Sequence, residues 1–281
     1  MNTVSWNPIG FLERSFKFNT QKWKSEISNL ESIKLPGIHL KRLDWDSTFF
    51  EADIFKILYL GENANSNDAY KLFAEKKKPK KRTQYFLEIP SEATNHFGLL
   101  TRWGFSLIET RLTYYHLLEE IPLTNQLSRN ALENDIIKLK KVASSAINLF
   151  DRYHVDSFFP KSDTDKYLEV YIENCIKGFA EKVFVPDLTT DPASFVAISR
   201  LKEPEWLEEG PLFRIPLTAC LPENKGWHYP LCIAALNYAK ANKSKCLVMT
   251  TQSTNKAVIH NCEKMGFKLG SSFHIFSKSF L

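Results

Sequence analysis

The chain has 281 residues, a net charge of +5, 43% hydrophobic and 25% charged residues; this is an ordinary globular composition with room for one large domain or two small ones. No apolar run approaches the roughly 20 residues of a membrane-spanning helix, and the first residues lack the charged start and apolar core of a secretory signal. Five cysteines without a CxxC or His/Cys cluster indicate a reducing cytoplasm and argue against a disulfide framework or a metal site.

Basic residues outnumber acidic ones only slightly, 37 against 32, which suits an anionic ligand without requiring one. Much of the excess lies in one run, KKKPKKR, from Lys76 to Arg82. This run could be a nucleic-acid patch, a nuclear signal or a solvated loop broken by proline. We favour the loop and expect no nucleic-acid partner, because no zinc finger, aromatic RNA-binding signature or heptad-linked basic region accompanies the run.

The first part of the chain predicts an extension followed by sheet-like segments. Residues 1–36 are expected to form the extension, with an amphipathic helix around Lys22–Ile33. From Ile38 onward, IHLKRLDWDSTFF leads into the strand ADIFKILYL, and a helix is expected around Asn67–Lys77. YFLEIP predicts a strand, SEATNHFGLLTRW a helix with Ser91 as N-cap, and GFSLIETRLTYYHLLE a strand rich in β-formers.

The second part alternates helices and strands. DIIKLKKVASSAINLFDRY is expected to pass from strand to helix, HVDSFFPKSDTD to form a loop, and KYLEVYIENCIKG to form a helix. KVFVPDL and SFVAISRLK predict strands, FRIPLTACLPENKG a strand leaving into a loop, and HYPLCIAALNYAKANK a helix. The alternation favours a mixed α/β sheet, and no GxGxxG or P-loop motif is present.

The most informative block runs from Cys246 to Phe267. CLVMTTQ predicts a buried strand, and STNKAVIHNCEKMG predicts a short helix with Ser253 or Thr254 as N-cap and Gly266 as its stop. A last strand, FKLGSSFHIFSKSF, follows. A similar order occurs earlier, because Gly104-Phe105 with its preceding helix matches Gly266-Phe267 at a constant offset.

This internal similarity predicts two related α/β halves, over residues 37–134 and 135–281, with residues 121–134 as the connection. Each half is expected to be a mixed, mostly antiparallel sheet flanked by helices. The second half is expected to be complete and the first to lack cofactor machinery.

Four segments resemble a known family in the right order. LDWDSTFF, GFSLIETRLTYY, the loop and helix RYHVDSFFPKSDTDKYLEVYIENCIKG, and TTQSTNKAVIHNCEKMGF resemble signatures of the TDP-fucosamine acetyltransferase type within the GNAT superfamily. The resemblance implies an α/β fold of two GNAT-like halves with a splayed-strand acyl-coenzyme A site in the second.

The resemblance also implies a set of coenzyme contacts. The strand FRIPLTAC, with Leu217 and Ala219, is expected to present backbone groups to the pantetheine arm, and Pro216 marks either a splayed, bulged strand or merely a sheet edge. A degraded pyrophosphate loop from Glu223 to His228 keeps Gly226, and Lys225 or protonated His228 could partly compensate by charge. Alternatively this is an ordinary helix-starting loop. The full set of expected coenzyme contacts is Leu217, Ala219, Lys225, Gly226, Trp227, His228, Tyr229 and Asn255.

Catalytic residues are harder to name. Cys262 occupies the position of the family's general-acid tyrosine, and it could donate a proton or be a small core residue. The general-base candidates are His154, Glu169 and His228, each of which could instead pack or cap. The expected substrate contacts, with arginine suited to pyrophosphate and aromatic rings to thymine or sugar faces, are Arg152, Tyr153, His154, Glu169 and Tyr171.

The resemblance implies a cytoplasmic N-acyltransferase without a metal, and possibly a homodimer. It would move an acetyl or 3-hydroxybutanoyl-type group from acyl-coenzyme A to the 3- or 4-amino group of a dTDP-linked amino-dideoxyhexose, in bacterial surface-polysaccharide synthesis. Two alternatives stay open. One is an N-acetyltransferase acting on a non-sugar amine, and the other is a non-catalytic protein that binds acyl-coenzyme A and a nucleotide sugar.

Overall fold

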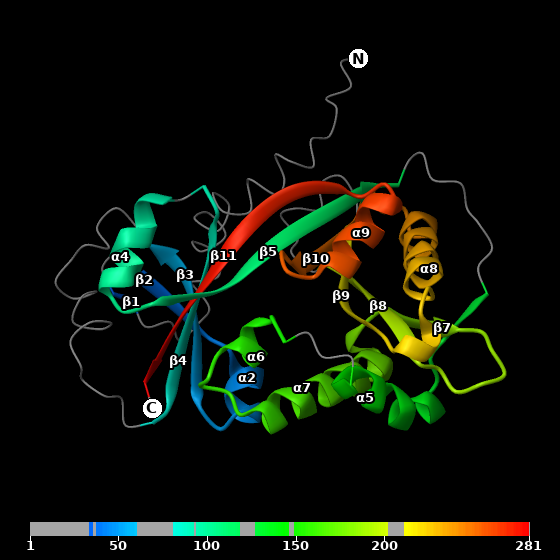
Figure 1. Cartoon of the computed structure of the whole chain (residues 1–281), viewed down its shortest axis with the longest axis horizontal. Helices are drawn as coiled ribbons and strands as arrows, with labels where there is room; N and C mark the ends of the chain where they lie inside the picture. The colour runs from blue at the N-terminus through cyan, green and yellow to red at the C-terminus, as the bar shows by residue number, and fades with distance from the viewer. Residues whose placement is uncertain are drawn as a thin grey trace, which may run out of the picture. The chain divides into compact units, whose positions relative to one another are not determined.

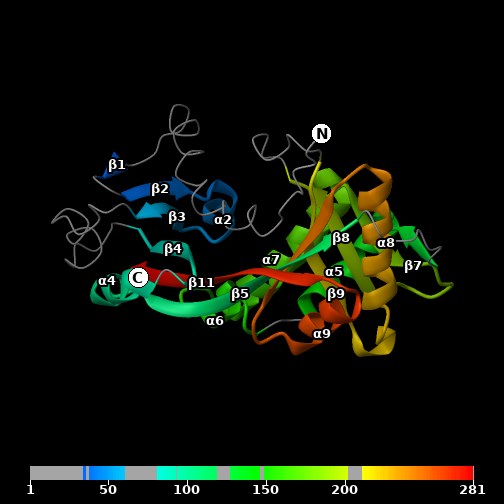
Figure 2. The same cartoon turned by 90° about the horizontal axis from the view of Figure 1, so that it is seen from above.

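The computed structural model describes residues 34–35, 38–60, 81–92, 94–118, 127–145, 149–201 and 211–280, and Figures 1 and 2 show its elements from two sides. The helices expected around Lys22–Ile33 and Asn67–Lys77 lie outside these residues, as do most of the predicted extension, most of the basic run and part of the predicted connection. Contacts divide the chain into two compact units. Unit 1 comprises Met1–Leu112, Phe150–Pro160 and Gly270–Leu281, and unit 2 comprises Thr113–Leu149 and Lys161–Leu269.

Unit 1 is built on a sheet with the strand order β1-β2-β3-β4-β11-β5. β3 and β4 are parallel, whereas β2 pairs antiparallel with β3, and β4 pairs antiparallel with β11. Its elements are β1 (Lys34–Leu35), β2 (Ile38–Arg42), α2 (Asp44–Phe49), β3 (Asp53–Leu60), β4 (Thr83–Pro90), a 3-10 turn (Thr94–His96), α4 (Phe97–Arg102), the first part of β5 (Ser106–Leu117), α6 (Arg152–Val155) and most of β11 (Lys268–Phe280).

The two faces of β4 have different surroundings. Successive side chains of a strand point to opposite faces, and Tyr85, Leu87 and Ile89 share a buried cluster with Leu100 of α4. On the opposite face, Gln84 bonds Asp156, and Phe86 stacks against Phe159. The segment Phe150–Pro160 therefore covers a face of the unit 1 sheet. This differs from the predicted division, which groups this segment and residues 270–281 with the second half.

Unit 2 is built on the strand order β11-β5-β10-β9-β8-β7-β6. The pairs β6–β7, β7–β8 and β8–β9 are antiparallel, and β9 is parallel to β10. Its elements are β6 (Ser128–Asn130), α5 (Ile136–Ser145), α7 (Lys161–Asn174) with a π-helical end (Cys175–Phe179), β7 (Lys182–Pro186), β8 (Ser194–Arg200), β9 (Phe213–Cys220), α8 (His228–Ala241), β10 (Cys246–Gln252), α9 (Lys256–Lys264) and the adjoining ends of β5 and β11.

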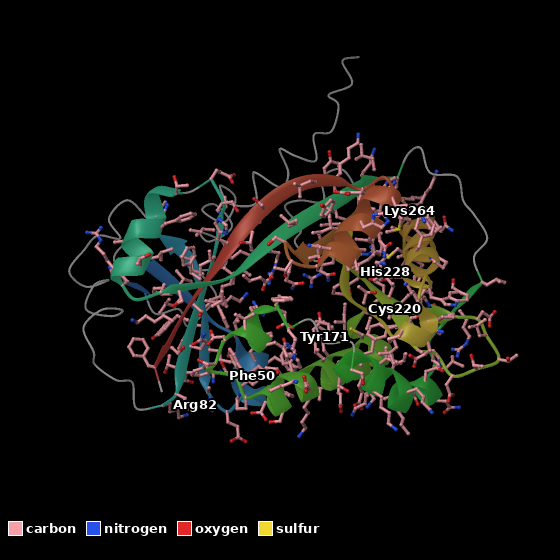
Figure 3. The ribbon with its side chains drawn as sticks, in the orientation of Figure 1. Phe50, Arg82, Tyr171, Cys220, His228 and Lys264 are labelled. Atoms are coloured by element: carbon pink, nitrogen blue, oxygen red, sulfur yellow. The ribbon has the colours of Figure 1, made fainter. Side chains whose placement is uncertain are left out.

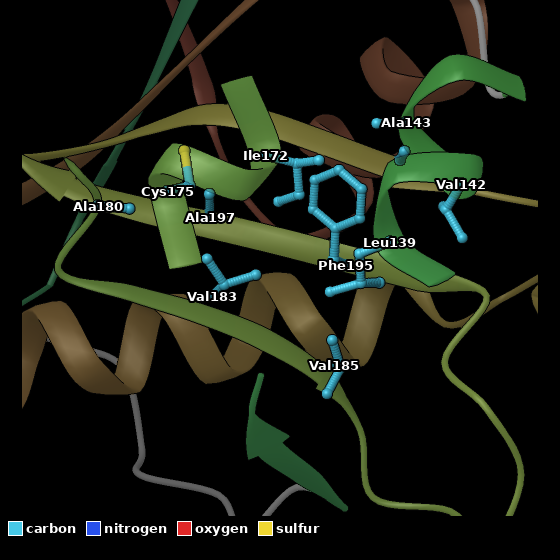
Figure 4. Close-up of a cluster of buried hydrophobic side chains, with 11 residues drawn as sticks. Leu139, Val142, Ala143, Ile172, Cys175, Ala180, Val183, Val185, Phe195 and Ala197 are labelled. Atoms are coloured by element: carbon cyan, nitrogen blue, oxygen red, sulfur yellow. The ribbon is translucent and has the colours of Figure 1, made fainter. Parts of the chain in front are cut away.

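Helices cover both faces of this sheet. On one face, Phe195 and Ala197 of β8 pack with Leu139 of α5 and Ile172 of α7 (Figure 4). On the other face, the ring of Tyr238 in α8 contacts Phe184 and Phe213. The expected mixed α/β sheet flanked by helices is thus confirmed.

The structure repeats itself at an offset of 162 positions, the distance from Gly104 to Gly266. Both glycines have positive φ angles, +76° and +83°, which favour glycine. Both follow a helix, α4 or α9, that ends with the same three backbone hydrogen bonds. These run from Trp103, Gly104 and Phe105 to Leu99, Thr101 and Leu100, and from Met265, Gly266 and Phe267 to Asn261, Glu263 and Cys262.

The repeat extends into the strands that follow. In unit 1, Phe280 of β11 pairs with Thr83 of β4. The residues 162 positions away from that pair are Leu118 and Lys245, and the amide of Leu118 donates to the carbonyl of Lys245 at 3.1 Å. The last strand of each repeat therefore belongs to both units. β5 begins in unit 1 and ends in unit 2, and β11 begins in unit 2 and ends in unit 1.

Some local expectations were wrong. LDWDSTFF, expected to continue the sheet, contains the helix α2, in which Ser47 is buried and its hydroxyl accepts from the amide of Ile54. Residues 135–145 contain no strand, because Asp135 closes a helix start by accepting from the amide of Leu132 and pairing with Arg129. The first error arises where the Ser47 hydroxyl bonds the neighbouring strand β3, and the second where Asp135 makes a local helix-start contact.

Candidate active site

The two parallel strands of unit 2 part at Pro216. Phe213, Arg214 and Ile215 of β9 pair with Leu247, Val248 and Met249 of β10, and this pairing stops although both strands continue. On its other side, β9 pairs with β8. Arg214 and Leu217 of β9 are three residues apart, whereas their partners on β8, Ser199 and Ala197, are only two apart. The extra residue is thus on β9, at Ile215–Pro216, and forms a bulge. A bulge and a parting of strands coincide at the proline.

β9 leads directly to the start of α8. Leu221 and a 3-10 turn, Pro222–Asn224, connect the two. Gly226 then has a φ of +100°, and a Cβ built there would have no heavy atom within 4 Å. Gly226 is thus explained by backbone conformation and not by crowding. The first N–H groups of a helix and its dipole attract anions, and Lys225, exposed at this point, adds a positive charge.

A thiol that was not among the predicted site residues lies against this helix start. Cys220, the last residue of β9, has its Sγ 2.9 Å from the carbonyl oxygen of Asn224. Burial raises the pKa of the Cys220 thiol, and hydrogen bonds from the amides of His228 and Trp227 act in the opposite direction. Two of the first amides of α8 are therefore partly engaged by sulfur. In the sequence Cys220 is the last residue of a strand, so no local pattern indicated that its thiol lies at the start of α8.

His228 lies inside the protein and does not face solvent. Its Nδ1 accepts from the side-chain amide of Asn261 at 3.0 Å, and its Nε2 is 3.5 Å from the sulfur of Cys232. Burial lowers the pKa of His228 to about 4. The expectation that a protonated His228 adds positive charge is thus wrong at neutral pH, because the ring is neutral there. The imidazole instead links α8 to α9 through its hydrogen bond with Asn261.

The other predicted residues of this loop surround the start of α8. Trp227 and Tyr229 are half-buried. The ammonium group of Lys264, at the end of α9, lies 5.3 Å from the centre of the Tyr229 ring, a cation–π distance. Lys264 is labelled with Cys220 and His228 in Figure 3. Lys264 was not predicted as a site residue.

Cys262 has the surroundings of a core residue. It has no exposed surface, and its Sγ is 3.4 Å from the sulfur of Met249. Burial, followed by the charge of Glu263, raises the pKa of the thiol to about 12. The residue 162 positions earlier is Leu100, which is equally buried in the unit 1 core. These contacts favour packing over proton donation.

Asn255 caps the helix α9. Its side-chain oxygen accepts from the amide of Val258 at 3.3 Å. The N-cap is therefore Asn255, and not Ser253 or Thr254. A capping role gives this asparagine a structural reason to be present.

The predicted substrate residues fall in different units. Arg152, Tyr153 and His154 form α6 in unit 1, whereas Glu169 and Tyr171 belong to α7 in unit 2. The side chain of His154 is 2% exposed, and its Nδ1 lies 2.6 Å from the carboxylate of Asp151. This pairing fixes the imidazole in the fold of α6.

Tyr153 and Tyr171 both lie among other aromatic rings. The hydroxyl of Tyr153 donates to Asp46 of α2, and its ring is 5.5 Å from that of Phe50. Tyr171 stacks near Tyr167 and meets Phe179, which is 57% exposed. The W-D-S-T-F-F and R-Y signature segments, far apart in sequence, therefore pack together in unit 1.

Unit 1 also contains a cluster of charged side chains. Arg111 of β5 forms two hydrogen bonds with Glu109 and lies 3.6 Å from Glu88 of β4, which also pairs with Lys56 of β3 at 3.2 Å. Burial alone raises the pKa of Glu88, but the charges of Lys56, Arg111 and Arg152 lower it to about 2. Glu109 and Arg111 belong to the signature GFSLIETRLTYY. Their i, i+2 spacing on a strand, which places both on one face, was the available signal for this cluster.

Among the described residues, no group of three His, Cys, Asp or Glu side chains is arranged to hold a metal ion. In the same part of the chain, no helix combines the length and apolar character needed to span a membrane.

No family model and no curated protein matches the chain. Solved structures are similar to it. A GCN5-related N-acetyltransferase from Kribbella flavida has a TM-score of 0.57 at 10% identity, over 94% of this chain and 95% of that one. One from Sphaerobacter thermophilus has a TM-score of 0.53 at 8% identity, over 87% and 77%. A tandem GNAT protein from the clavulanic acid biosynthesis pathway has a TM-score of 0.50 at 10% identity, over 81% and 75%. The chain has the GNAT fold.

Proposed function

We propose that the protein is an acyl-coenzyme A-dependent N-acyltransferase. The observation that carries the proposal is the parting of β9 from β10 at the bulged Pro216, followed at once by the open Gly226 and the start of α8. Parted strands leave backbone N–H and C=O groups without a strand partner, and such groups must find partners elsewhere. The amide groups of a pantetheine arm are suitable partners.

The same arrangement suits the chemistry of acyl transfer. The start of α8, with Lys225 beside it, attracts the coenzyme's phosphates. An amine held near the thioester attacks its carbonyl carbon, and we expect backbone N–H groups of β9 beyond the bulge to stabilise the oxyanion. The predicted contacts of Leu217, Ala219, Trp227 and Tyr229 remain part of this proposal, as does that of Asn255, whose side-chain oxygen is used in capping.

For the acceptor, we propose a dTDP-linked amino-dideoxyhexose, as the signature segments suggest. Support comes from the packing of these segments in unit 1, where Tyr153 bonds Asp46, and Arg111 meets Glu88. Arginine side chains are well suited to a pyrophosphate. The proposed acceptor contacts remain Arg152, Tyr153, His154, Glu169 and Tyr171. The proposed transferred groups remain acetyl and 3-hydroxybutanoyl.

One observation favours the non-catalytic alternative. Neither Cys262 nor His228 is placed to transfer a proton, because one thiol is buried with a pKa of about 12 and one imidazole is buried with a pKa of about 4. A protein that only binds its ligands would need no proton-transferring residue. An N-acetyltransferase acting on a non-sugar amine also stays open.

The test is calorimetric titration with acetyl-coenzyme A and longer thioesters, followed by mass spectrometry of reactions with 3-amino and 4-amino dTDP-hexoses and a panel of plain amines. Binding of a thioester and acylation of an amino sugar supports the proposal. Acylation of plain amines without nucleotide binding favours the second candidate. Binding without turnover favours the third, and failure to bind any thioester removes the acyl-coenzyme A account.

A further inference from the structure

An exposed arginine lies next to the point where β9 and β10 part. Arg214 of β9 pairs with Val248 of β10, and only one further pair, Ile215 with Met249, follows before the strands separate. Arg214 is exposed, and among the described residues its guanidinium group has no hydrogen-bond or ion-pair partner. An unpaired cation is therefore present where the strands begin to part.

The strand register shows which face of the sheet this cation occupies. Arg214 pairs directly with Ser199 of β8, and opposite residues on antiparallel strands point to the same face. Ser199 follows Phe195 and Ala197 at even spacing, so it shares their face, which packs against α5 and α7. Burial raises the pKa of the Cys175 thiol, at the end of α7, to about 12, and the charge of Arg214 acts in the opposite direction. Arg214 thus lies on the α7 face of unit 2.

Two hydroxyl groups share this face with Arg214. Ser199 is 7% exposed, and its hydroxyl has no hydrogen-bond partner among the described residues. On the other side of Arg214, Thr250 is exposed and lies two residues after Val248, so both point to the face of Arg214. A guanidinium and two hydroxyls are hydrogen-bond donors. Together they suit an oxyanion.

The first repeat contains an oxyanion at the equivalent place. Lys56 of β3 pairs with Phe86 of β4, again with one further pair before the strands part, so it corresponds to Arg214. Glu88, 162 positions before Thr250, lies just beyond the last pair, and its carboxylate is 3.2 Å from the Nζ of Lys56. A cation at this position therefore reaches an anion on the neighbouring strand. The second repeat keeps the cation but has a small hydroxyl in place of the carboxylate.

We infer that Arg214 is a specificity-determining residue that binds an oxyanion of the acceptor, in the place where the first repeat has its own carboxylate. This inference rests on the proposed acyl transfer and narrows its substrate class to amines that also carry a phosphate or a carboxylate. Arg214 is three residues from Leu217, at most about 10 Å along the strand. A sugar ring and the long arginine side chain can together span this distance. The pyrophosphate of a dTDP-linked amino sugar meets the requirement.

The first test compares Arg214→Gln with Arg200→Gln. Arg200 is a matched control, because it is exposed on the neighbouring strand but contacts the Phe213 ring on the α8 face and lies 3.7 Å from Glu181. Arg214→Gln should lower kcat/KM for a 4-amino dTDP-hexose about 30-fold, mainly through KM, as expected for a lost charged hydrogen bond. With the same amino sugar lacking nucleotide and phosphate, kcat/KM should change by less than about threefold, as should the dissociation constant of acetyl-coenzyme A. Arg200→Gln should change none of these by more than about threefold.

The second test restores the charge pair of the first repeat. Thr250→Glu places a carboxylate beside Arg214 and should lower kcat/KM for the dTDP-hexose about 30-fold, whereas Thr250→Gln, of equal size, should lower it less than about fivefold. An amino uronic acid, which carries a carboxylate in place of the pyrophosphate, serves as a further acceptor. The wild-type preference between the two acceptors identifies the bound oxyanion as phosphate or carboxylate.

Three results overturn the inference while leaving acyl transfer in place. They are an equal loss in Arg214→Gln with charged and uncharged acceptors, wild-type kinetics in that variant, and a loss of acetyl-coenzyme A affinity of about tenfold or more. The last would assign Arg214 to the coenzyme. Absence of turnover in the wild-type protein with every amine instead removes the proposed function, and the inference with it.

Discussion

The two repeats have the same strand pairing at their centres and differ in what surrounds it. In the first repeat the parallel pair β3–β4 ends at Ile57 and Leu87, and in the second β9–β10 ends at Ile215 and Met249. Leu87 and Met249 are again 162 positions apart. Strands that part are therefore a property of the repeated fold, and parting alone does not distinguish a ligand site.

The difference lies beyond the last pair. In the first repeat, Glu88 follows Leu87 directly and is bound by Lys56 and Arg111. In the second repeat, Thr250 follows Met249 and is exposed. A bulge is present in both repeats, in β3 between Ile57 and Tyr59 and in β9 at Ile215–Pro216. We expect charge pairs to stabilise the first repeat, and free backbone groups to bind a ligand in the second.

The largest expected effect on ligand binding is at Gly226, where a substitution distinguishes ligand binding from stability. A valine at φ +100° is strained by roughly 1–2 kcal/mol, and a shifted helix start should weaken acetyl-coenzyme A binding about tenfold or more. Gly178→Val is the matched control, because Gly178 has a φ of +109° and an equally open surrounding. Calorimetry and thermal unfolding should show similar destabilisation of both variants and weaker binding only in Gly226→Val. Equal affinities in the two variants would contradict the role of this loop.

Glu88 provides the next effect, on stability in acid. Its pKa of about 2 in the folded protein lies below the ordinary value of 4.5, so its contribution is present above about pH 4.5 and is lost as the pH falls towards 2. The contribution is at most about 3 kcal/mol. Urea unfolding at pH 5 and pH 3 should show a smaller loss for Glu88→Gln than for wild type. Equal losses would mean that the charge cluster is not coupled to folding.

His228 should produce a smaller effect in a different pH range. Its folded pKa of about 4 lies below the ordinary 6.5, so protonation opposes folding and stability falls as the pH drops from 6.5 towards 4. His228→Gln should lose up to about 2 kcal/mol less than wild type between pH 7 and pH 5, as measured by urea unfolding. If the two proteins show the same pH dependence, the imidazole is not held in its neutral form.

The smallest effect is expected at Cys262, and it tests whether this position resembles Leu100. Cys262→Ala should destabilise the protein by about 1 kcal/mol, as expected for a small cavity, and keep kcat within about threefold. A loss of turnover of 100-fold with an unchanged melting temperature would restore the thiol as proton donor.

Local sequence patterns predicted much of the fold but not its long-range pairing. CLVMTTQ became β10, and Gly266 ends α9 with a positive φ, because apolar runs and helix stops are local properties. The neighbours of β5 depend on contacts with residues more than 100 positions away, so no pattern around Leu118 indicated that its amide bonds the carbonyl of Lys245. The same applies to His228, whose sequence neighbours did not reveal its contact with Asn261 on α9.

Binding of coenzyme A at the parted strands can be measured by hydrogen–deuterium exchange with and without a non-hydrolysable acetyl-coenzyme A thioether. We expect slower exchange at Leu217–Ala219 and at the start of α8, and no change in β3 and β4 of the first repeat. Unchanged exchange in β9 at saturating ligand, or protection of β3 and β4 instead, would contradict this expectation.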